Sequence, residues 1–408
     1  MESTSPLKSV TITTDKPPPP AEQTTASPRT MDLSDSPTTQ PPPPPTADPQ
    51  PLADDPLNNP YASLNDLCHD LTSLQDLTSR GSWLTILDKV SRARSLSLLT
   101  KPHEHLLYLT FNALALTKLR RFVDAIAELD SLEDLKSPQY LYQNYPHIYP
   151  NITGSMVPFA LRWLHAELPS KHNKRQKTLD RFYTLLDFVR TKLTDKSSEK
   201  LSDSSAELWR KREVFVMNSI ISHHLSHKEF GICIDLIRDL INRSESESLD
   251  SRTMLLSKLG YVQMQYGDLE GAKGTFGFIE NLVKEGNGEV ELRNLVSRNK
   301  ALMYMVGKDY ISAVREYEEC MERDGTDVVA INNKAICLMY LRDLSDSIKV
   351  LESALERIPT MALNETLVVN LCSMYELAYV NHSDIKRTLS SWIARVAPDD
   401  FDSSCTRI

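Results

Sequence analysis

The sequence predicts an all-α protein, a solenoid of stacked helical hairpins that follows a disordered N-terminal arm. Three observations support this fold class. From Tyr61 onward, apolar residues recur every three or four positions. No run of alternating β-branched residues indicates a strand, and several stretches repeat one helix-turn-helix pattern. We therefore predict an arm over 1–60, a solenoid over 61–400 and a flexible tail over 401–408.

The arm differs from the rest of the chain in composition. Residues 1–60 contain 16 of the 24 prolines, no glycine, and 3 Lys or Arg against 8 Asp or Glu. Such a segment buries too little apolar surface to offset the entropy of ordering its backbone. Two interpretations stay open: a solvating tail, which we favour, or a docking segment for proline-binding domains, switched by phosphorylation at Ser5, Ser27 or Ser36.

The helices follow from blocks of apolar periodicity, each about 12 to 20 residues long and separated by short polar breaks. Links this short join neighbouring helices into hairpins. In chain order the predicted helices are 63–79, 81–98, 103–119, 121–134, 156–168, 174–194, 205–225, 228–243, 250–266, 268–284, 289–306, 309–323, 327–342, 344–358, 363–381 and 384–396.

The repeats identify the hairpin type. A helix-turn-helix unit of about 34 residues needs a small residue where its helices cross. The clearest copies are 250–284, with Gly260, Ala272 and Phe276; 294–325, with Ala301, Ala313 and Tyr317; and 327–360, with Ala335, Ser347 and Leu351. This pattern is typical of tetratricopeptide repeats, which stack into a right-handed superhelix without independent cores.

Composition excludes several classes of protein. The formal net charge is −9, without the basic excess of a nucleic-acid-binding protein. No stretch is long and apolar enough for a membrane span, and the start MESTSPLKSV has no signal core, so we expect a soluble, cytoplasmic protein. The six cysteines lie far apart and are expected to be buried thiols.

No motif predicts catalysis, a cofactor or a metal. Residues 271–277 are glycine-rich but lack the ending of a phosphate-binding loop, and no nucleophile elbow occurs. His223 and His227 have a spacing that can grip a metal, yet neither a third ligand nor a catalytic glutamate accompanies them. A polar helix end is the better interpretation, and we predict that the protein is not an enzyme.

One segment departs from the repeats: residues 139–168 contain four tyrosines and three prolines. Pro146 and Pro150 exclude a helix between them and favour an extended ribbon, and Ser155 is a plausible N-cap for a helix with Pro158 in its first turn. The tyrosine rings either cover apolar surface of the solenoid or face a partner protein. The residues alone leave both alternatives open.

In this segment, YPHIYP followed by GSMVPFALRWLHAEL resembles the hallmark stretch of the subunit 12 family of the trafficking protein particle (TRAPP) complex. The resemblance continues through LWRKR at 208–212 and NNKAICLMYLRDLSDSIKVLE, and it covers most of residues 100–381. It implies a non-catalytic scaffold of the TRAPP III-type tethering assembly in ER-to-Golgi traffic and autophagy. The proline-rich arm does not match the longer tail of animal members, so mitotic roles are not transferred.

The resemblance also implies the partners, namely other TRAPP subunits and, indirectly, a Rab GTPase on Golgi membranes, with membrane contact only through the complex. Candidate protein-binding residues, carried over by motif, are Tyr145, Pro146, His147, Tyr149, Pro150, Gly154, Ser155, Met156, Val157, Pro158, Phe159, His165 and Glu167. The alternative function is a co-chaperone adaptor that clamps peptide carboxylates, for which Asn333 is suitably placed but Arg298 and Leu302 are not the expected Lys and Asn.

Overall fold

The computed structural model describes residues 71–132, 134–194, 203–243, 249–285 and 289–407, which all belong to one compact unit. The predicted arm, Cys68 and the start of the first predicted helix lie outside the described residues. The α-helices are α2 (Leu71–Ser79), α3 (Trp83–Ser95), α4 (Pro102–Lys118), α5 (Phe122–Asp130), α6 (Phe159–Glu167), α7 (Arg175–Thr194), α8 (Asp203–Ser226), α9 (Phe230–Arg243), α10 (Leu249–Tyr266), α11 (Leu269–Glu285), α12 (Val290–Val306), α13 (Tyr310–Arg323), α14 (Val328–Tyr340), α15 (Leu344–Arg357), α16 (Pro359–Ala362), α17 (Glu365–Ala378) and α18 (His382–Val396).

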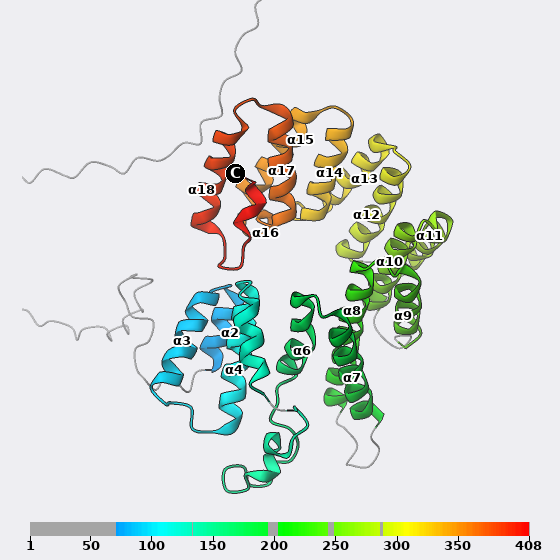
Figure 1. Cartoon of the computed structure of the whole chain (residues 1–408). Helices are drawn as coiled ribbons and strands as arrows, with labels where there is room; N and C mark the ends of the chain where they lie inside the picture. The colour runs from blue at the N-terminus through cyan, green and yellow to red at the C-terminus, as the bar shows by residue number, and fades with distance from the viewer. Residues whose placement is uncertain (1–70, 133, 195–202, 244–248, 286–288, 408) are drawn as a thin grey trace, which may run out of the picture. The chain divides into compact units, whose positions relative to one another are not determined.

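These helices form hairpins that stack in chain order, as Figure 1 shows. The hairpins are α4–α5, α6–α7, α8–α9, α10–α11, α12–α13, α14–α15 and α17–α18. The first helices of neighbouring hairpins also touch directly, for example α4 with α6, α10 with α12 and α14 with α17. The predicted all-α architecture of stacked hairpins is confirmed.

Four details differ from the sequence prediction. The short helix α16 and the 3-10 turns at 138–140, 142–144 and 168–172 were not predicted, because periodicity does not detect elements of one turn. The helix predicted to start at residue 156 begins at Phe159. The predicted flexible tail is wrong over its described residues: Ser403–Thr406 forms a 3-10 turn whose Cys405 and Thr406 are buried.

The small residues predicted at the helix crossings lie in the core. A Cβ atom on Gly260 would stand 2.3 Å from the Phe276 ring, so only glycine lets α10 and α11 approach this closely. Ala301, Ala313 and Ala335 are fully buried, and the Ser347 hydroxyl donates a 2.6 Å hydrogen bond to the Ala335 carbonyl across α14 and α15. The crossing residues therefore set the distance between the helices.

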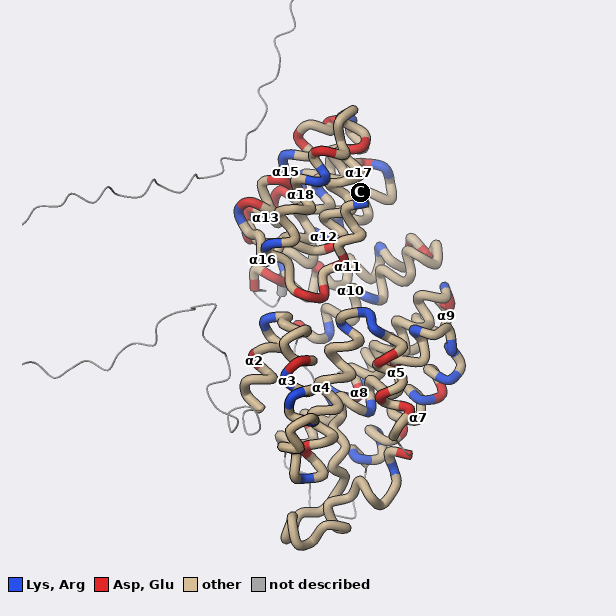
Figure 2. Tube along the Cα trace, turned by 60° about the vertical axis from the view of Figure 1, so that its left-hand side comes forward, with Lys and Arg blue, Asp and Glu red and all other residues tan. Residues whose placement is uncertain are grey.

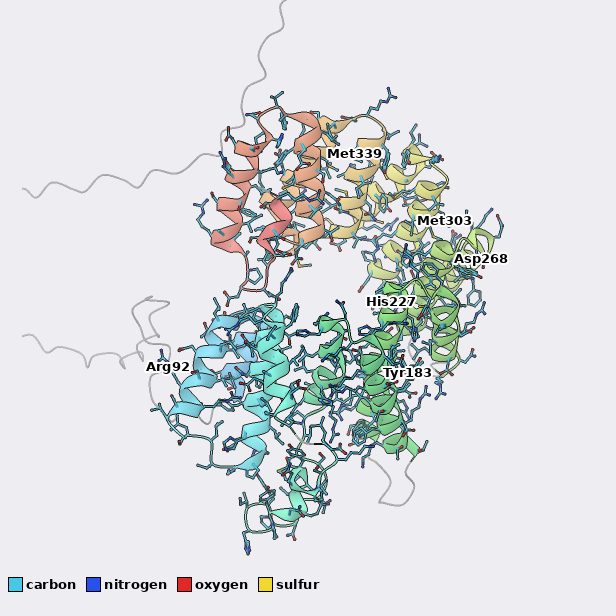
Figure 3. The ribbon with its side chains drawn as sticks, viewed as in Figure 1. Arg92, Tyr183, His227, Asp268, Met303 and Met339 are labelled. Carbon is cyan, nitrogen blue, oxygen red and sulfur yellow. The ribbon has the colours of Figure 1, made fainter. Side chains whose placement is uncertain are left out.

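The turns inside three hairpins share one device. A residue with positive φ ends the first helix, and an aspartate then caps the second: Gly267 and Asp268, Lys308 and Asp309, and Arg342 and Asp343. Asp268 lies at the turn between α10 and α11 (Figure 3), and its carboxylate accepts a 2.9 Å hydrogen bond from the Gly271 amide. The residue with positive φ reverses the chain direction, and the aspartate carboxylate accepts a hydrogen bond from a free backbone amide in the first turn of the next helix.

Lys308 has φ of 61°. This left-handed conformation is strained for a residue that has a Cβ atom, whereas glycine adopts it without strain. We expect Lys308→Gly to raise the free energy of unfolding by about 0.5 to 1 kcal/mol. Urea denaturation of the variant measures this gain. The same substitution at Lys273, an exposed position inside α11, should lower stability by about 1 kcal/mol. Equal losses at both positions would contradict the argument.

Residues 398–402, beyond α18, contact the start of α3 and the end of α4. The Asp399 amide donates to the Gly81 carbonyl at 3.3 Å, and the Leu84 amide donates to the Asp399 carboxylate at 2.9 Å. Lys118 at the end of α4 pairs with Asp400 at 3.0 Å. These contacts join segments about 300 residues apart in the chain.

The charged residues do not segregate into one basic or acidic region, since blue Lys and Arg and red Asp and Glu are mixed along the trace (Figure 2). The five described cysteines are buried and free, as predicted. Burial raises the pKa of the Cys320, Cys337 and Cys405 thiols to about 11, which keeps them protonated at neutral pH. None of the described helices has the length and apolar composition to cross a membrane.

Candidate functional site

The segment with the tyrosines, here called the tyrosine loop (residues 138–158), folds onto α4 and α6. Tyr149 is 7% exposed, its hydroxyl contacts Nδ1 of His103 on α4 at 2.6 Å, and its ring packs edge-on against Tyr142 at 4.9 Å. Tyr140, Tyr142 and Tyr145 are half-buried against the same apolar cluster. In this structure the rings cover apolar surface, which is one of the two alternatives that the sequence left open.

Backbone hydrogen bonds close the base of the loop. The Tyr142 amide donates to the Gly154 carbonyl at 3.0 Å, and the Met156 amide donates to the Tyr140 carbonyl at 2.8 Å. Gly154 has φ of 108°, which favours glycine, and the next residues inward, Met156 and Val157, are buried. The two ends of the loop are therefore joined at its base by these two backbone hydrogen bonds.

Two local predictions for this loop are wrong. The chain between Pro146 and Pro150 is not extended, because the Ile148 and Tyr149 amides both donate to the Tyr145 carbonyl in a tight turn. Ser155 is not the N-cap of α6, which begins after Pro158. The Ser155 hydroxyl instead accepts hydrogen bonds from the Val157 amide and from Arg162.

The tip of the loop is exposed and partly apolar. Pro146, His147 and Pro150 are exposed, as are Ile148 at 43% and Ile152 at 48%. Sequence reasoning missed the two isoleucines, because they follow no helical or strand period. Exposed apolar side chains on a loop with a fixed base are suited to contact another protein.

The remaining candidate residues lie behind the loop, on α6. Phe159 and His165 are half-buried. Glu167 accepts from His223 at 2.7 Å and pairs with Lys171 at 3.2 Å. Burial opposes its charge, but the hydrogen bond from His223 and the Lys171 ammonium hold the pKa of Glu167 below its ordinary value. Glu167 thus links α6 to α8.

His165 predicts a pH dependence of stability. Burial, together with Arg181 and Lys177, lowers its pKa from 6.5 to about 4. Between these pH values the unfolded chain binds the proton and the folded chain does not, so stability falls as the pH falls from 6.5 to 4. Allowing for screening by solvent, we expect His165→Gln to remove about 2 kcal/mol of this loss. Thermal unfolding at both pH values measures it, and His147→Gln, at the exposed tip, should leave the loss unchanged.

The histidines near the end of α8 are each engaged within the fold. His224 contacts Glu229 at 2.5 Å and the Tyr183 hydroxyl at 3.2 Å, and His227 contacts the His223 carbonyl at 2.9 Å. Tyr183 and His227 are labelled in Figure 3, on α7 and just beyond the end of α8. The described residues hold no group of three or more His, Cys, Asp or Glu arranged to bind a metal ion.

A second surface feature is an open groove of about 1150 Å³ along α12, α14 and α17, lined by Asn294, Asn333 and Asn364 among others. Its polar groups are largely paired. The Asn333 amide nitrogen donates to the Tyr317 hydroxyl at 3.2 Å, and Arg298 pairs with the buried Asp327 at 2.6 Å. Both side chains thus already have partners within the fold.

Two curated proteins match most of the chain. It is 31% identical over 316 residues to trafficking protein particle complex subunit 12 of Mus musculus, covering 74% of this chain and 39% of the mouse protein. It is 29% identical over 357 residues to the Homo sapiens protein of that name, covering 82% of this chain and 48% of the human one. The chain thus spans less than half of the length of these relatives, and no family model matches it.

Solved structures match the chain at low identity and with TM-scores below 0.5. Apo RapI is 9% identical, with 79% of this chain and 85% of that chain covered and a TM-score of 0.42. The yeast Sti1 TPR2AB domain in its pHSP90 complex is 13% identical, with 60% and 93% covered and a TM-score of 0.24. The sequence matches, in contrast, confirm the resemblance seen in the residues: over most of its length, this chain of stacked tetratricopeptide-type hairpins is a homologue of trafficking protein particle complex subunit 12.

Proposed function

We propose that the chain is a non-catalytic scaffold subunit of a TRAPP III-type vesicle-tethering complex. The observation that carries the proposal is the 31% identity to subunit 12 over 316 residues. In this role the chain holds other TRAPP subunits in place and thereby supports activation of a Rab GTPase in ER-to-Golgi and Golgi traffic and in autophagy. It works in the cytoplasm and reaches Golgi membranes through the complex.

The tyrosine loop supports this proposal as a contact for another subunit. Its base is closed by hydrogen bonds, so the tip loses little conformational entropy when a partner binds. The tip presents His147 beside the exposed Ile148 and Ile152. Tyr149 and Met156, among the candidate residues, are buried beneath and hold the tip in position.

Co-purification of the tagged full chain from its native cells tests the proposal. Wild type is expected to recover other TRAPP subunits, and Ile148→Asp combined with His147→Ala should lower their recovery at least fivefold. Val123→Asp is the matched control, because Val123 is an exposed apolar residue outside the tyrosine loop, on α5, and its replacement should leave recovery unchanged. If wild type recovers no TRAPP subunit, the proposal is wrong.

The co-chaperone adaptor is the opposing outcome. Recovery of a chaperone alone, together with micromolar binding of a peptide that ends in a free carboxylate and loss of that binding in Asn333→Ala, would establish it. The hydrogen bond from Asn333 to Tyr317 and the ion pair of Arg298 with Asp327 weigh against it.

A further inference from the structure

Aromatic side chains and one arginine form a continuous face where α6 lies beside α8. On α8, Leu208, Arg212 and Phe215 follow each other at spacings of four and three residues and therefore share one side of the helix. From α6, Phe159 and Trp163 pack against Phe215 with ring centroids at 6.4 and 5.5 Å. We call these five residues, together with Trp209, the arginine–aromatic face.

Arg212 is held in a fixed position by rings. Its guanidinium lies 4.4 Å from the centre of the Trp209 ring and 5.0 Å from that of Phe159. Within the described part of the chain it makes neither a hydrogen bond nor an ion pair, and burial alone lowers its pKa. A guanidinium stacked in this way is oriented, and its N–H donors remain available.

Among the described residues, the two carboxylates nearest to Arg212 along α8 are engaged elsewhere. Glu207, five residues before it on α8, pairs with Lys211 at 2.6 Å. Glu213, the next residue, pairs with Arg190 at 2.8 Å. The exposed Lys192, close to the Phe188 ring that packs on Trp209, adds further positive charge nearby. This part of the surface therefore attracts an anionic partner.

The face also presents apolar surface. Leu208 is 47% exposed and Phe215 is 49% exposed, on either side of Arg212 along α8. Tryptophan and arginine are among the residue types that dominate the binding energy of protein interfaces, and phenylalanine is enriched at the centre of such interfaces. A free phosphate or a nucleic-acid backbone would use the charge but leave the apolar side chains uncovered.

We propose that the arginine–aromatic face binds an acidic segment of another protein. One carboxylate of the segment pairs with the guanidinium of Arg212, and a neighbouring apolar side chain packs on Phe215 and Leu208. Charge complementarity selects this partner, since Arg212 lacks a counter-ion within the described residues and an apolar surface adjoins it on both sides. The inference does not depend on which complex the chain joins.

Fluorescence anisotropy with the full chain tests the proposal. The probe is a labelled ten-residue peptide of Asp and Glu with a central Phe and Leu. Wild type is expected to bind it with a dissociation constant of about 100 µM or lower, and Arg212→Glu should weaken binding at least tenfold. Arg212→Lys should weaken it about threefold, because an ammonium lacks the planar fork. Circular dichroism checks that both variants fold. If one of them does not, Arg212→Gln is measured in its place.

The matched control is Arg210→Glu, which changes the same charge on the same helix but away from the face and should alter binding less than twofold. A peptide with Asn and Gln in place of Asp and Glu should bind at least tenfold more weakly. Equal losses in the Arg212 and Arg210 variants, equal binding of the amide peptide, or no binding at 1 mM peptide would overturn the proposal. Tighter binding of a single-stranded oligonucleotide that displaces the peptide would also overturn it.

Discussion

Asp327→Ala is expected to lower the free energy of unfolding by about 4 kcal/mol. The Asp327 side chain is only 2% exposed and pairs with Arg298 at 2.6 Å. It also accepts hydrogen bonds from the Ala330 amide at 3.0 Å, as the N-cap of α14, and from Asn294 at 3.2 Å. The substitution removes the ion-pair partner of the partly buried Arg298 and also removes the helix cap. Urea denaturation monitored by circular dichroism gives the change.

The matched control is Asp343→Ala. Asp343 caps α15 by accepting the same kind of hydrogen bond, from the Asp346 amide at 3.2 Å, but it is exposed and pairs with no arginine of the described residues. This substitution should cost about 1 kcal/mol. If both variants lose the same stability, the ion pair with Arg298 contributes nothing beyond the cap, and the expectation for Asp327 fails.

Gly260→Val is expected to lower the free energy of unfolding by about 3 kcal/mol. The added Cβ would stand 2.3, 2.7 and 2.9 Å from three carbon atoms of the Phe276 ring, a distance at which α10 and α11 must separate or the ring must turn. Both helices belong to a packed core and cannot move without opening contacts on neighbouring hairpins. Chemical denaturation measures the loss.

Gly274→Val provides the control for Gly260, because it is the same substitution in the neighbouring helix α11, where nothing lies within 4 Å of the new Cβ. It should change stability by no more than about 0.5 kcal/mol. A second check is the double variant Gly260→Ala with Phe276→Leu, in which the smaller side chain makes room. The double variant should lose less unfolding free energy than the two single variants lose together, by at least about 1 kcal/mol. Simple additivity would show that the ring is not the obstacle.

Most helices could be predicted from the sequence because the signals for them are local. Apolar residues at three- and four-residue spacing predict the buried stripe of each helix, and Gly267 followed by Asp268 marks a turn. The crossing residues Gly260 and Ala313 could be found because the repeat places them at fixed offsets. Each of these features depends on residues within one hairpin.

The features that were missed depend on residues far apart in the chain. The path of the tyrosine loop depends on His103, which precedes Tyr149 by 46 residues and contacts its hydroxyl. The stacking of Arg212 on Phe159 requires α6 beside α8, which no local pattern encodes. The exposed Ile148 was missed for another reason: an isolated apolar residue in a loop has no period to reveal which way it points. Binding surfaces are thus harder to predict than the repeats that carry them.

The contacts of residues 398–402 with α3 and α4 change how the array should come apart. In a linear stack of repeats each end frays independently, because a terminal hairpin has one neighbour only. Here Asp399 bonds the backbone at Gly81 and Leu84, so α3 cannot open without releasing the segment that follows α18. The two extremities melt as one cooperative step, and high ionic strength, which weakens the Lys118–Asp400 pair, makes that step easier.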